Sequence, residues 1–329
     1  MIYKKWMKKL PAMLSVLLSV LLLAGCAGQV EPAGDEAFSI GIIQLVEHPA
    51  LDAAREGFIV ALESEGIAVT YDHQNAQADA ATLSTIAQRF VNNDVDLILA
   101  IATGSAQAAA SETSDIPIVG TAITDYEVAR LVDRNDAPGG NVTGASDMMP
   151  VERQIDLIPA FVPDARTIGI LYSSNEPNAV LQAELAIAAV QALGLTAEVG
   201  TVTTVGDVQQ VTASIANRVD AIYIPTDNTY ASAMPLVSQI SLESGVPVFA
   251  ADEDMVLGGG VATLGISYFD LGYQSGMMAA QILRGEATPA TMPIQWADGF
   301  SYVVNGDMAD ALGIAIPEQY LPYVKSAQQ

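Results

Sequence analysis

The feature that most constrains this chain is a strand–loop–helix unit that occurs twice. The first copy spans residues 39–58, with an apolar strand, a polar loop at Glu47 and His48, and a helix predicted to begin at Pro49. Proline is favoured in the first turn of a helix, because its missing N–H would have no partner there. The second copy begins at Thr167, aligns with the first without a gap, and repeats its glycine and its proline.

Two later pairs of segments match in the same order. Residues 95–98 match 219–222, and residues 116–119 match 246–249. Three matches in one order favour two lobes of the same architecture over a run of short repeats. The alternative is that any α/β chain shows this hydrophobic pattern, but here the prolines match as well.

Apolar strand segments alternate with segments of helical period, which is typical of parallel sheets covered by helices on both faces. The strands of the first half are expected at 40–46, 68–72, 97–102, 118–123 and 142–146, with helices at 50–64, 79–91 and 105–111. The strands of the second half are expected at 168–172, 197–201, 221–225, 248–251, 262–266 and 302–304, with helices at 151–158, 179–193, 208–217 and 231–244. A last helix is expected at 268–284.

The predicted fold is therefore α/β, with two Rossmann-like lobes joined by a three-segment hinge. Lobe 1 is expected to contain residues 38–145 and 268–296, and lobe 2 residues 146–267 and 297–329. A two-lobed protein with such a hinge closes around a ligand.

The N-terminus has the features of an export signal. Four lysines precede an apolar run at residues 13–23, and Leu23-Ala24-Gly25-Cys26 follows. The run is shorter than the roughly 20 residues that a membrane span needs. Leu-Ala-Gly-Cys resembles the bacterial lipobox, which predicts a signal peptide at 1–25, lipidation of Cys26 and a flexible linker at 26–37. The alternative is a chance cysteine in a plain secretory signal.

Composition excludes some classes of protein. Cys26 is the only cysteine, so an internal disulfide is excluded. Loss of the signal would remove four lysines and no acids, and would make the formal net charge of −25 more negative still. Such a surface repels phosphate, so nucleic acid is not an expected partner.

Polar loops follow the predicted strands, and in open parallel sheets ligands bind beyond the carboxyl ends of the strands. The candidate ligand-binding residues are Gln44, Glu47, His48, Thr103, Gly104, Ser105, Thr124, Asp125, Ser174, Asn175, Glu176, Thr226, Asp227, Asn228, Asp252 and Tyr268.

These loops offer two kinds of group. N–H groups at helix starts, as at residues 103–105 and 226–228, can hold a carboxylate. The acids Glu47, Asp125, Asp227 and Asp252 can hold an ammonium group. Together they suit an amino-acid zwitterion. The alternative for each single residue is an ordinary N-cap without contact to a ligand.

Motifs for metal, nucleotide and catalysis are missing. His48 and His73 are the only histidines, and no further ligands stand at metal spacing. The chain has no Gly-x-Ser-x-Gly motif, and no Walker lysine follows Gly258-Gly259-Gly260. We therefore expect no metal, no cofactor and no enzyme activity.

Several motifs resemble the bacterial ABC-transporter substrate-binding proteins of the tryptophan/tyrosine-binding type. The specific segments are Glu-His-Pro-Ala-Leu-Asp at 47–52 and Pro-Thr-Asp-Asn-Thr at 225–229, and weaker matches stand at 40–44, 75–77, 100–103, 116–119, 141–144 and 271–276. The resemblance implies a type I periplasmic-binding fold, no catalysis, an aromatic amino acid as ligand, and delivery to a permease with its ATPase. A monomer anchored outside the cytoplasm through Cys26 is expected.

Two segments depart from that family's pattern. Residues 103–107 read Thr-Gly-Ser-Ala-Gln where many relatives carry Thr-Pro-Ala-Ala-Gln, and Tyr126 stands where proline is common. Both lie in predicted binding loops, so ligands other than tryptophan stay open. Two other functions also stay open: a ligand-sensing lipoprotein that docks on a membrane kinase or chemoreceptor, and an exported enzyme.

Overall fold

The strands of this protein lie in three sheets. The computed structural model describes residues 37–297 and 299–326. The predicted signal peptide and Cys26 lie outside the described residues. In the largest sheet every strand pair is parallel, and the strand order is β11-β5-β4-β3-β1-β2. Its strands are β1 (Phe38–Gln44), β2 (Val69–Asn75), β3 (Leu97–Ile101), β4 (Ile118–Ile123), β5 (Val142–Ser146) and β11 (Gln295–Trp296).

The second sheet repeats the order of the first. It is parallel throughout and runs β7-β6-β8-β9. Its strands are β6 (Thr167–Ser173), β7 (Thr196–Val202), β8 (Ala221–Ile224) and β9 (Val248–Ala250). β6 lies between β7 and β8 as β1 lies between β2 and β3, and the helices after β1 and β6 both begin with proline. The internal repeat and the α/β class predicted from sequence are confirmed.

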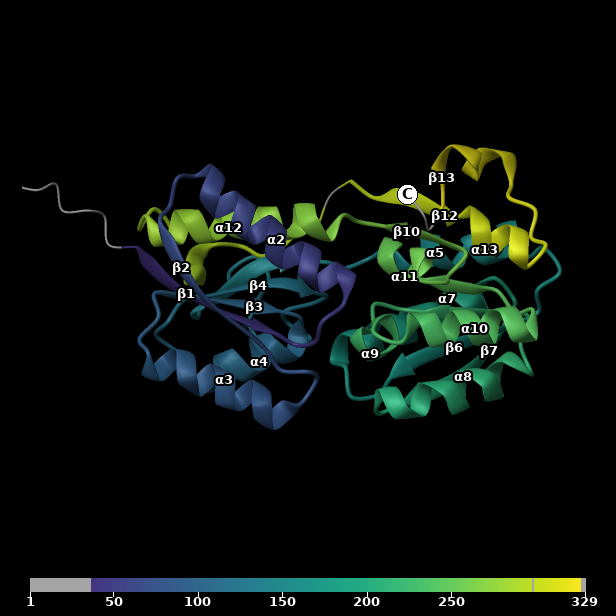
Figure 1. The fold of residues 1–329 in the computed structure, drawn as a ribbon, viewed down its shortest axis with the longest axis horizontal. Helices are drawn as coiled ribbons and strands as arrows, with labels where there is room; N and C mark the ends of the chain where they lie inside the picture. Colours follow the sequence, from purple (N-terminus) through teal and green to yellow (C-terminus); the bar gives the residue numbers. More distant parts are fainter. Residues whose placement is uncertain (1–36, 298, 327–329) are drawn as a thin grey trace, which may run out of the picture. The chain divides into compact units, whose positions relative to one another are not determined.

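Helices cover both faces of the six-stranded sheet (Figure 1). On one face lie α2 (Pro49–Ser64) and α12 (Tyr268–Leu283), and on the other α3 (Ala80–Asn92) and α4 (Thr103–Glu112). The inner strands β3, β4 and β5 are buried at every position, because alternate residues point to opposite faces and helices cover both faces. Ile40 and Ile42 pack in the cluster that contains α2, while Ile43 packs in the cluster that contains α3.

The four-stranded sheet is covered in the same way. The helices α5 (Val151–Ile155), α6 (Leu157–Phe161) and α7 (Pro177–Ala192) pack with alternate strand residues such as Ile170 in one cluster. The helices α8 (Val208–Ala216) and α10 (Met234–Ser244) pack with Leu171 in another. Each sheet therefore lies between two apolar layers.

Glycines let α2 and α12 pack with their backbones in contact. A Cβ on Gly272 would lie against the backbone oxygen of Ala54, and a Cβ on Gly57 would lie against that of Phe269. Neither position has room for a side chain. Figure 1 shows the two helices side by side over the six-stranded sheet.

One helix predicted as continuous is broken in two, and another begins later than predicted. A break divides the segment predicted at 151–158 into α5 and α6, and a second break separates the short helix α9 (Asn228–Ala231) from α10, so that the helix predicted at 231–244 begins at Met234. Pro159 and Pro235 lack the N–H that would bond the carbonyls of Ile155 and Ala231, four residues earlier. The prolines were visible in the sequence, and each marks the break.

The third sheet was not predicted. It joins β10 (Ala262–Gly265) to β12 (Ser301–Asn305) as an antiparallel pair, and β12 to β13 (Val324–Lys325) in parallel. Two short helices, α11 (Glu253–Leu257) and α13 (Gly306–Ala311), were also missed. They have five and six residues, which is too short for a hydrophobic period to be recognised. No helix in the described ranges has the length and apolar character to cross a bilayer.

Candidate functional site

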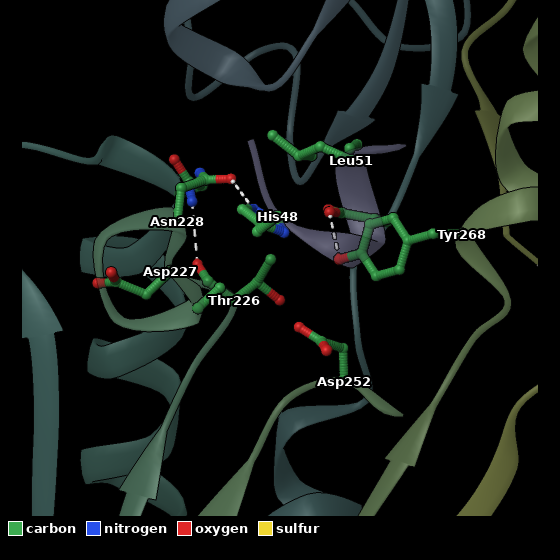
Figure 2. A pocket seen from close by; sticks show the side chains of 11 residues that line it. His48, Leu51, Thr226, Asp227, Asn228, Asp252 and Tyr268 are labelled. Carbon is green, nitrogen blue, oxygen red and sulfur yellow. Dashed lines mark hydrogen bonds between the residues drawn. The ribbon is translucent and has the colours of Figure 1, made fainter. Parts of the chain in front are cut away.

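A small pocket lies where strands of both parallel sheets end. Figure 2 shows it from close by. It is lined by His48, Leu51, Ala122, Asp147, Asn178, Thr226, Asp227, Asn228, Ala231, Asp252 and Tyr268. The lining side chains come from β4 or follow the carboxyl ends of β1, β5, β6, β8, β9 and β10, which is where open parallel sheets place ligands.

Asp147 anchors one wall of the pocket. Its carboxylate accepts hydrogen bonds from the Thr124 hydroxyl at 2.9 Å and from the Tyr268 hydroxyl at 3.0 Å. All three residues are buried. Burial raises the pKa of the Asp147 carboxyl above its ordinary value, although both hydroxyl bonds oppose that shift. The two bonds fix the ring of Tyr268 against the pocket.

Asp227 is held by the backbone. One carboxylate oxygen accepts from the N–H of Tyr230 at 2.8 Å and so caps α9, while the other accepts from the N–H of Ser173. The side chain is buried, and burial and then the nearby charge of Glu176 raise the pKa of Asp227 well above its usual range. Its cap explains why a short helix starts here.

Asp252 is the pocket acid with the fewest hydrogen bonds. It caps α11 by accepting from the N–H of Met255 at 2.8 Å, and no side-chain donor bonds it in the described structure. Figure 2 shows its carboxylate pointing into the pocket toward Thr226. Burial raises the pKa of Asp252 to about 7. The Thr226 hydroxyl is also buried and has no hydrogen-bond partner in the described residues.

The opposite wall carries an imidazole and two amides. His48 Nε2 lies 3.1 Å from Asn228 Oδ1, and Asn178 donates to the Thr226 carbonyl at 3.0 Å. The bond from His48, in the loop before α2, to Asn228 of α9 joins residues that follow strands of different sheets. Burial lowers the pKa of His48, so the imidazole is neutral near pH 7.

The pocket itself is narrow. Its cavity volume is about 10 Å³, which is roughly the space that one water needs. A groove of about 930 Å³ adjoins it and shares Asn178 and Asn228 with it. Apolar side chains of Leu45, Val46 and Leu83 line part of the groove.

Six of the candidate residues meet in the pocket. These are His48, Thr226, Asp227, Asn228, Asp252 and Tyr268. Three others, Gly104, Asn175 and Glu176, line the groove. Thr124 lies behind the pocket and bonds Asp147.

The remaining candidates lie elsewhere. Gln44 is buried in a network with Asp52, Arg55 and His73, and Glu47 is exposed. Thr103 and Ser105 are buried in the first turn of α4, and Asp125 accepts from the N–H groups of residues 127 and 128. Ser174 is exposed and bonds the Val202 carbonyl.

Glu176 has a structural role that its position did not reveal. It accepts from the N–H groups of Asn228 and Thr229 and from both of their side chains, at 2.6 to 3.0 Å. Glu176 therefore holds the first turn of α9 in place beside the groove. Tyr126, which stands where the family commonly has proline, does not line the pocket. Its side chain is buried and donates to the Ala145 carbonyl.

Sequence reasoning missed five lining residues: Leu51, Ala122, Asp147, Asn178 and Ala231. Asp147 directly follows the predicted strand 142–146, so the rule that gave the other loops would also have found it. Asn178 stands directly before the predicted helix 179–193, two residues beyond the last candidate of its loop, and the three apolar residues have no polar signal.

The charges of the site are of one sign. Three carboxylates line the pocket, and within the described residues no lysine or arginine lines it or the groove. The described residues also contain no cluster of three or more His, Cys, Asp or Glu that could hold a metal. The lining therefore offers carboxylate acceptors for a positive group.

Comparisons with known proteins agree with this arrangement. A family model described as ABC transporter substrate binding protein matches residues 39–328. A tyrosine-binding protein of Clostridioides difficile (strain R20291) is 38% identical over 293 residues, 88% of this chain and 85% of the relative.

Solved structures are similar as well. An ABC domain from Streptococcus pneumonia in complex with L-Trp is 38% identical, with a TM-score of 0.85 over 88% of this chain and all of the other. The ligand-free, open structure of a substrate-binding protein with adhesive properties from Clostridium difficile is 41% identical with a TM-score of 0.68, over 88% of this chain and 99% of the other. Of these two, the L-Trp complex is the more similar in shape.

The fold is shared more widely. A leucine-binding protein from Thermotoga maritima is 15% identical with a TM-score of 0.58 over 76% of this chain, and that likeness shows the fold alone. The structure is thus a type I periplasmic-binding fold, as the sequence predicted. With a family model matching nearly the whole described region, this chain belongs to the ABC transporter substrate-binding protein family.

Proposed function

We propose that this chain is the ligand-binding receptor of an ABC uptake transporter and that its ligand is an aromatic amino acid. The observation that carries the proposal is the pocket of buried acids at the carboxyl ends of strands from both sheets. It is supported by the 38% identity to a tyrosine-binding protein and to a structure with L-Trp bound.

The ligand's ammonium group would lie beside Asp252. That carboxylate is buried, faces the pocket and bonds no side-chain donor in the described structure. A charged hydrogen bond to a buried acid is stronger than a neutral one. The ligand's ring would extend toward the groove, where Leu45 and Leu83 offer apolar contact.

Entry of such a ligand requires the pocket to widen, because its present volume of about 10 Å³ is far below that of an amino acid. We propose that the two predicted lobes separate about their three connections to admit it. The hydrogen bond between His48 and Asn228 would then break on opening and form again on closure.

Substrate-binding proteins of ABC transporters act outside the cytoplasm and are generally not enzymes. The proposed partners are a permease with its ATPase, which would receive the ligand. Lipidation of Cys26 would anchor the chain at the membrane, where we expect it to act as a monomer. The sequence of residues 23–26 supports this anchor.

Isothermal titration of the full chain tests the proposal. Tyrosine and tryptophan should each bind at one site per chain, and leucine, which lacks a ring, should bind at least tenfold more weakly. Equal binding of leucine would remove the aromatic specificity. Absence of binding by all natural amino acids would overturn the amino-acid ligand.

A further inference from the structure

The segment of residues 46–52 forms part of the pocket wall. His48 and Leu51 line the pocket, and His48 Nε2 lies 3.1 Å from Asn228 Oδ1 of α9. This contact joins residues that follow strands of the two parallel sheets. The place of the 46–52 segment therefore decides whether His48 reaches its partner.

The start of α2 does little to hold this segment by itself. His48 is the N-cap residue of α2, but in the described structure its side chain makes no capping hydrogen bond, and its ring bonds Asn228 instead (Figure 2). Pro49, the first residue of the helix, has no N–H to bond. On the other side, the backbone is bonded to the sheet at Leu45, whose N–H donates to the Ile101 carbonyl at 3.3 Å. The residues between these two points need another partner.

The side chain of Gln44 is that partner. Gln44 is the last residue of β1 and is fully buried. Its Nε2 donates to the Val46 carbonyl at 2.9 Å and to Asp52 Oδ1 at 2.9 Å. These acceptors stand at the two ends of the 46–52 segment, so one amide group ties the ends together. Both donors of the amide nitrogen are used in this way.

Arg55 and His73 hold the oxygen of the same amide. Arg55 Nη1 donates to Gln44 Oε1 at 2.6 Å and to Asp52 Oδ1 at 2.8 Å. His73 Nε2 lies 3.2 Å from Gln44 Oε1. A charged donor on the oxygen fixes the orientation of the amide, and its nitrogen then faces the segment. None of these four side chains lines the pocket or the groove.

We propose that Gln44 is a positioning residue: its amide holds the 46–52 segment in the place where His48 closes the pocket wall. The sequence made Gln44 a candidate for direct contact with a ligand. Its burial outside the pocket gives it a different role, in which it acts on binding through the segment that it holds. The inference rests on the proposed function, because the pocket that Gln44 shapes is the proposed ligand site.

Substitution of Gln44 by methionine tests the inference. Gln44→Met keeps the approximate volume and removes every bond of the amide, so the Kd for tyrosine, measured by isothermal titration of the full chain, should rise at least tenfold. Asp96→Ala is the matched control near the other end of β1, where the Asp96 carboxylate accepts from the N–H of Ser39 at 2.7 Å and from its hydroxyl at 2.8 Å. This control should lower the Tm and leave the Kd within twofold of the parent value.

A second variant avoids a substitution in the buried core. The side chain of Arg55 is 26% exposed, so Arg55→Met should fold like the parent chain. It removes the charged donor that orients the Gln44 amide but leaves the amide itself, and the Kd for tyrosine should rise at least threefold. If Gln44→Met and Arg55→Met both leave the Kd within twofold, the inference is wrong.

The imidazole of His48 gives a readout that a general loss of stability would not move. The chain has two histidines, so nitrogen-15 NMR of the ligand-free chain observes two rings, and His48→Gln identifies the signal of the pocket ring. Burial lowers the pKa of His48 and outweighs the opposing effects of the Asn228 bond and of nearby carboxylates. In Gln44→Met the ring should gain solvent and the pKa of His48 should rise toward its ordinary value, whereas in Asp96→Ala it should stay lowered.

The outcomes separate this inference from the proposed function. If tyrosine binds the parent chain and only one of the two readouts, the Kd or the pKa of His48, changes in Gln44→Met, the inference is wrong and the receptor for amino acids stands. The same holds if neither changes. If no natural amino acid binds but the pKa of His48 rises in Gln44→Met alone, Gln44 positions the segment and the amino-acid proposal fails. If no amino acid binds and the pKa does not move, both fail.

Discussion

At the scale of single residues, the site combines acids that serve the fold with acids that are free to serve a ligand. Asp227 accepts two backbone N–H groups, and Asp147 accepts two hydroxyls. Asp252 accepts the N–H that it caps. A buried acid with few hydrogen-bond donors has a raised pKa. The free energy that its ionisation costs the folded state can therefore be measured from the pH dependence of stability.

Asp252 should lower stability as the pH rises. Burial raises its pKa from 3.8 to about 7, so the folded state holds the proton more tightly than the unfolded chain. Its contribution to stability is full below about pH 4 and is lost as the pH rises through 7. The groups that face it, Asp147 and Asp254, act in the same direction. The shift corresponds to at most about 4 kcal/mol.

We therefore expect Asp252→Asn, which keeps the cap of α11, to raise the Tm of the ligand-free chain more at pH 8 than at pH 5. Circular dichroism melts at both pH values measure this. Asp79→Asn is the control, because Asp79 caps α3 through Thr82 in the same way but is exposed. An equal change in Tm at the two pH values would contradict the buried-acid explanation.

Asp227 should matter first for stability. Replacing it by alanine leaves the buried N–H groups of Ser173 and Tyr230 without their acceptor. Each such loss costs about 1–3 kcal/mol. Asp227→Ala should therefore shift the urea midpoint clearly downward, and Asp227→Asn, which retains one acceptor, should shift it less. If both variants unfold like the parent chain, the carboxylate is not needed by the fold.

The sequence could predict which loops lie together at the site, but not which of their residues line the pocket. Ser, Thr, Asp and Asn at helix starts are favoured equally by capping and by ligand binding. Glu176 and Asp125 proved to bind backbone N–H groups, whereas Asp252 both caps a helix and faces the pocket. This difference depends on the direction of side chains across the fold, which no local pattern carries.

At the scale of elements, the predicted and observed helices and strands agree best where a local backbone constraint, such as a proline, fixes the boundary. The helix start at Pro49 was predicted because proline favours the first turn, and the helix predicted at 179–193 begins two residues earlier, at the matching Pro177. The five-residue helix α11 was missed because Asp252 to Asp254 was interpreted as a polar loop. The antiparallel pair β10–β12 joins segments far apart in the chain, and periodicity does not show pairing partners.

The contact between α2 and α12 should tolerate no added side chain. A Cβ on Gly272 would overlap the backbone of Ala54, and backbone atoms cannot turn aside as a side chain can. Overpacking of this kind typically costs about 1–3 kcal/mol or more. Gly272→Ala should thus lower the free energy of unfolding in urea.

Gly140→Ala is the matched control for that experiment. A Cβ at Gly140 meets no atom within 4 Å, and its backbone is not in the left-handed region. This variant should unfold like the parent chain. A similar loss in both variants would indicate that the effect comes from the glycine backbone and not from the helix contact.

At the scale of the whole molecule, hydrogen bonds join the ends of the two parallel sheets. Gln182 of α7 donates to the Thr124 hydroxyl at 3.2 Å, beyond β4, and accepts from the N–H of Thr226 at 3.2 Å, beyond β8. Thr124 in turn bonds Asp147. Gln182 is fully buried and does not line the pocket. Gln182 therefore links the two sheets, but its side chain is not positioned to contact a ligand in the pocket.

If lobe separation admits the ligand, Gln182 should stabilise the arrangement that holds it. Gln182→Met keeps the approximate volume and removes both bonds, so the separated arrangement gains in population and the apparent affinity falls. Loss of one or two buried bonds, about 1–3 kcal/mol, corresponds to roughly a five- to 150-fold increase in the Kd.

Gln154→Met is the control, because the buried Gln154 bonds the Ala251 and Leu264 carbonyls and Tyr223, all beside the smaller sheets. It should lower the Tm and leave the Kd for tyrosine within about twofold. Equal Kd values for the two variants would mean that the link between the sheets plays no part in holding the ligand.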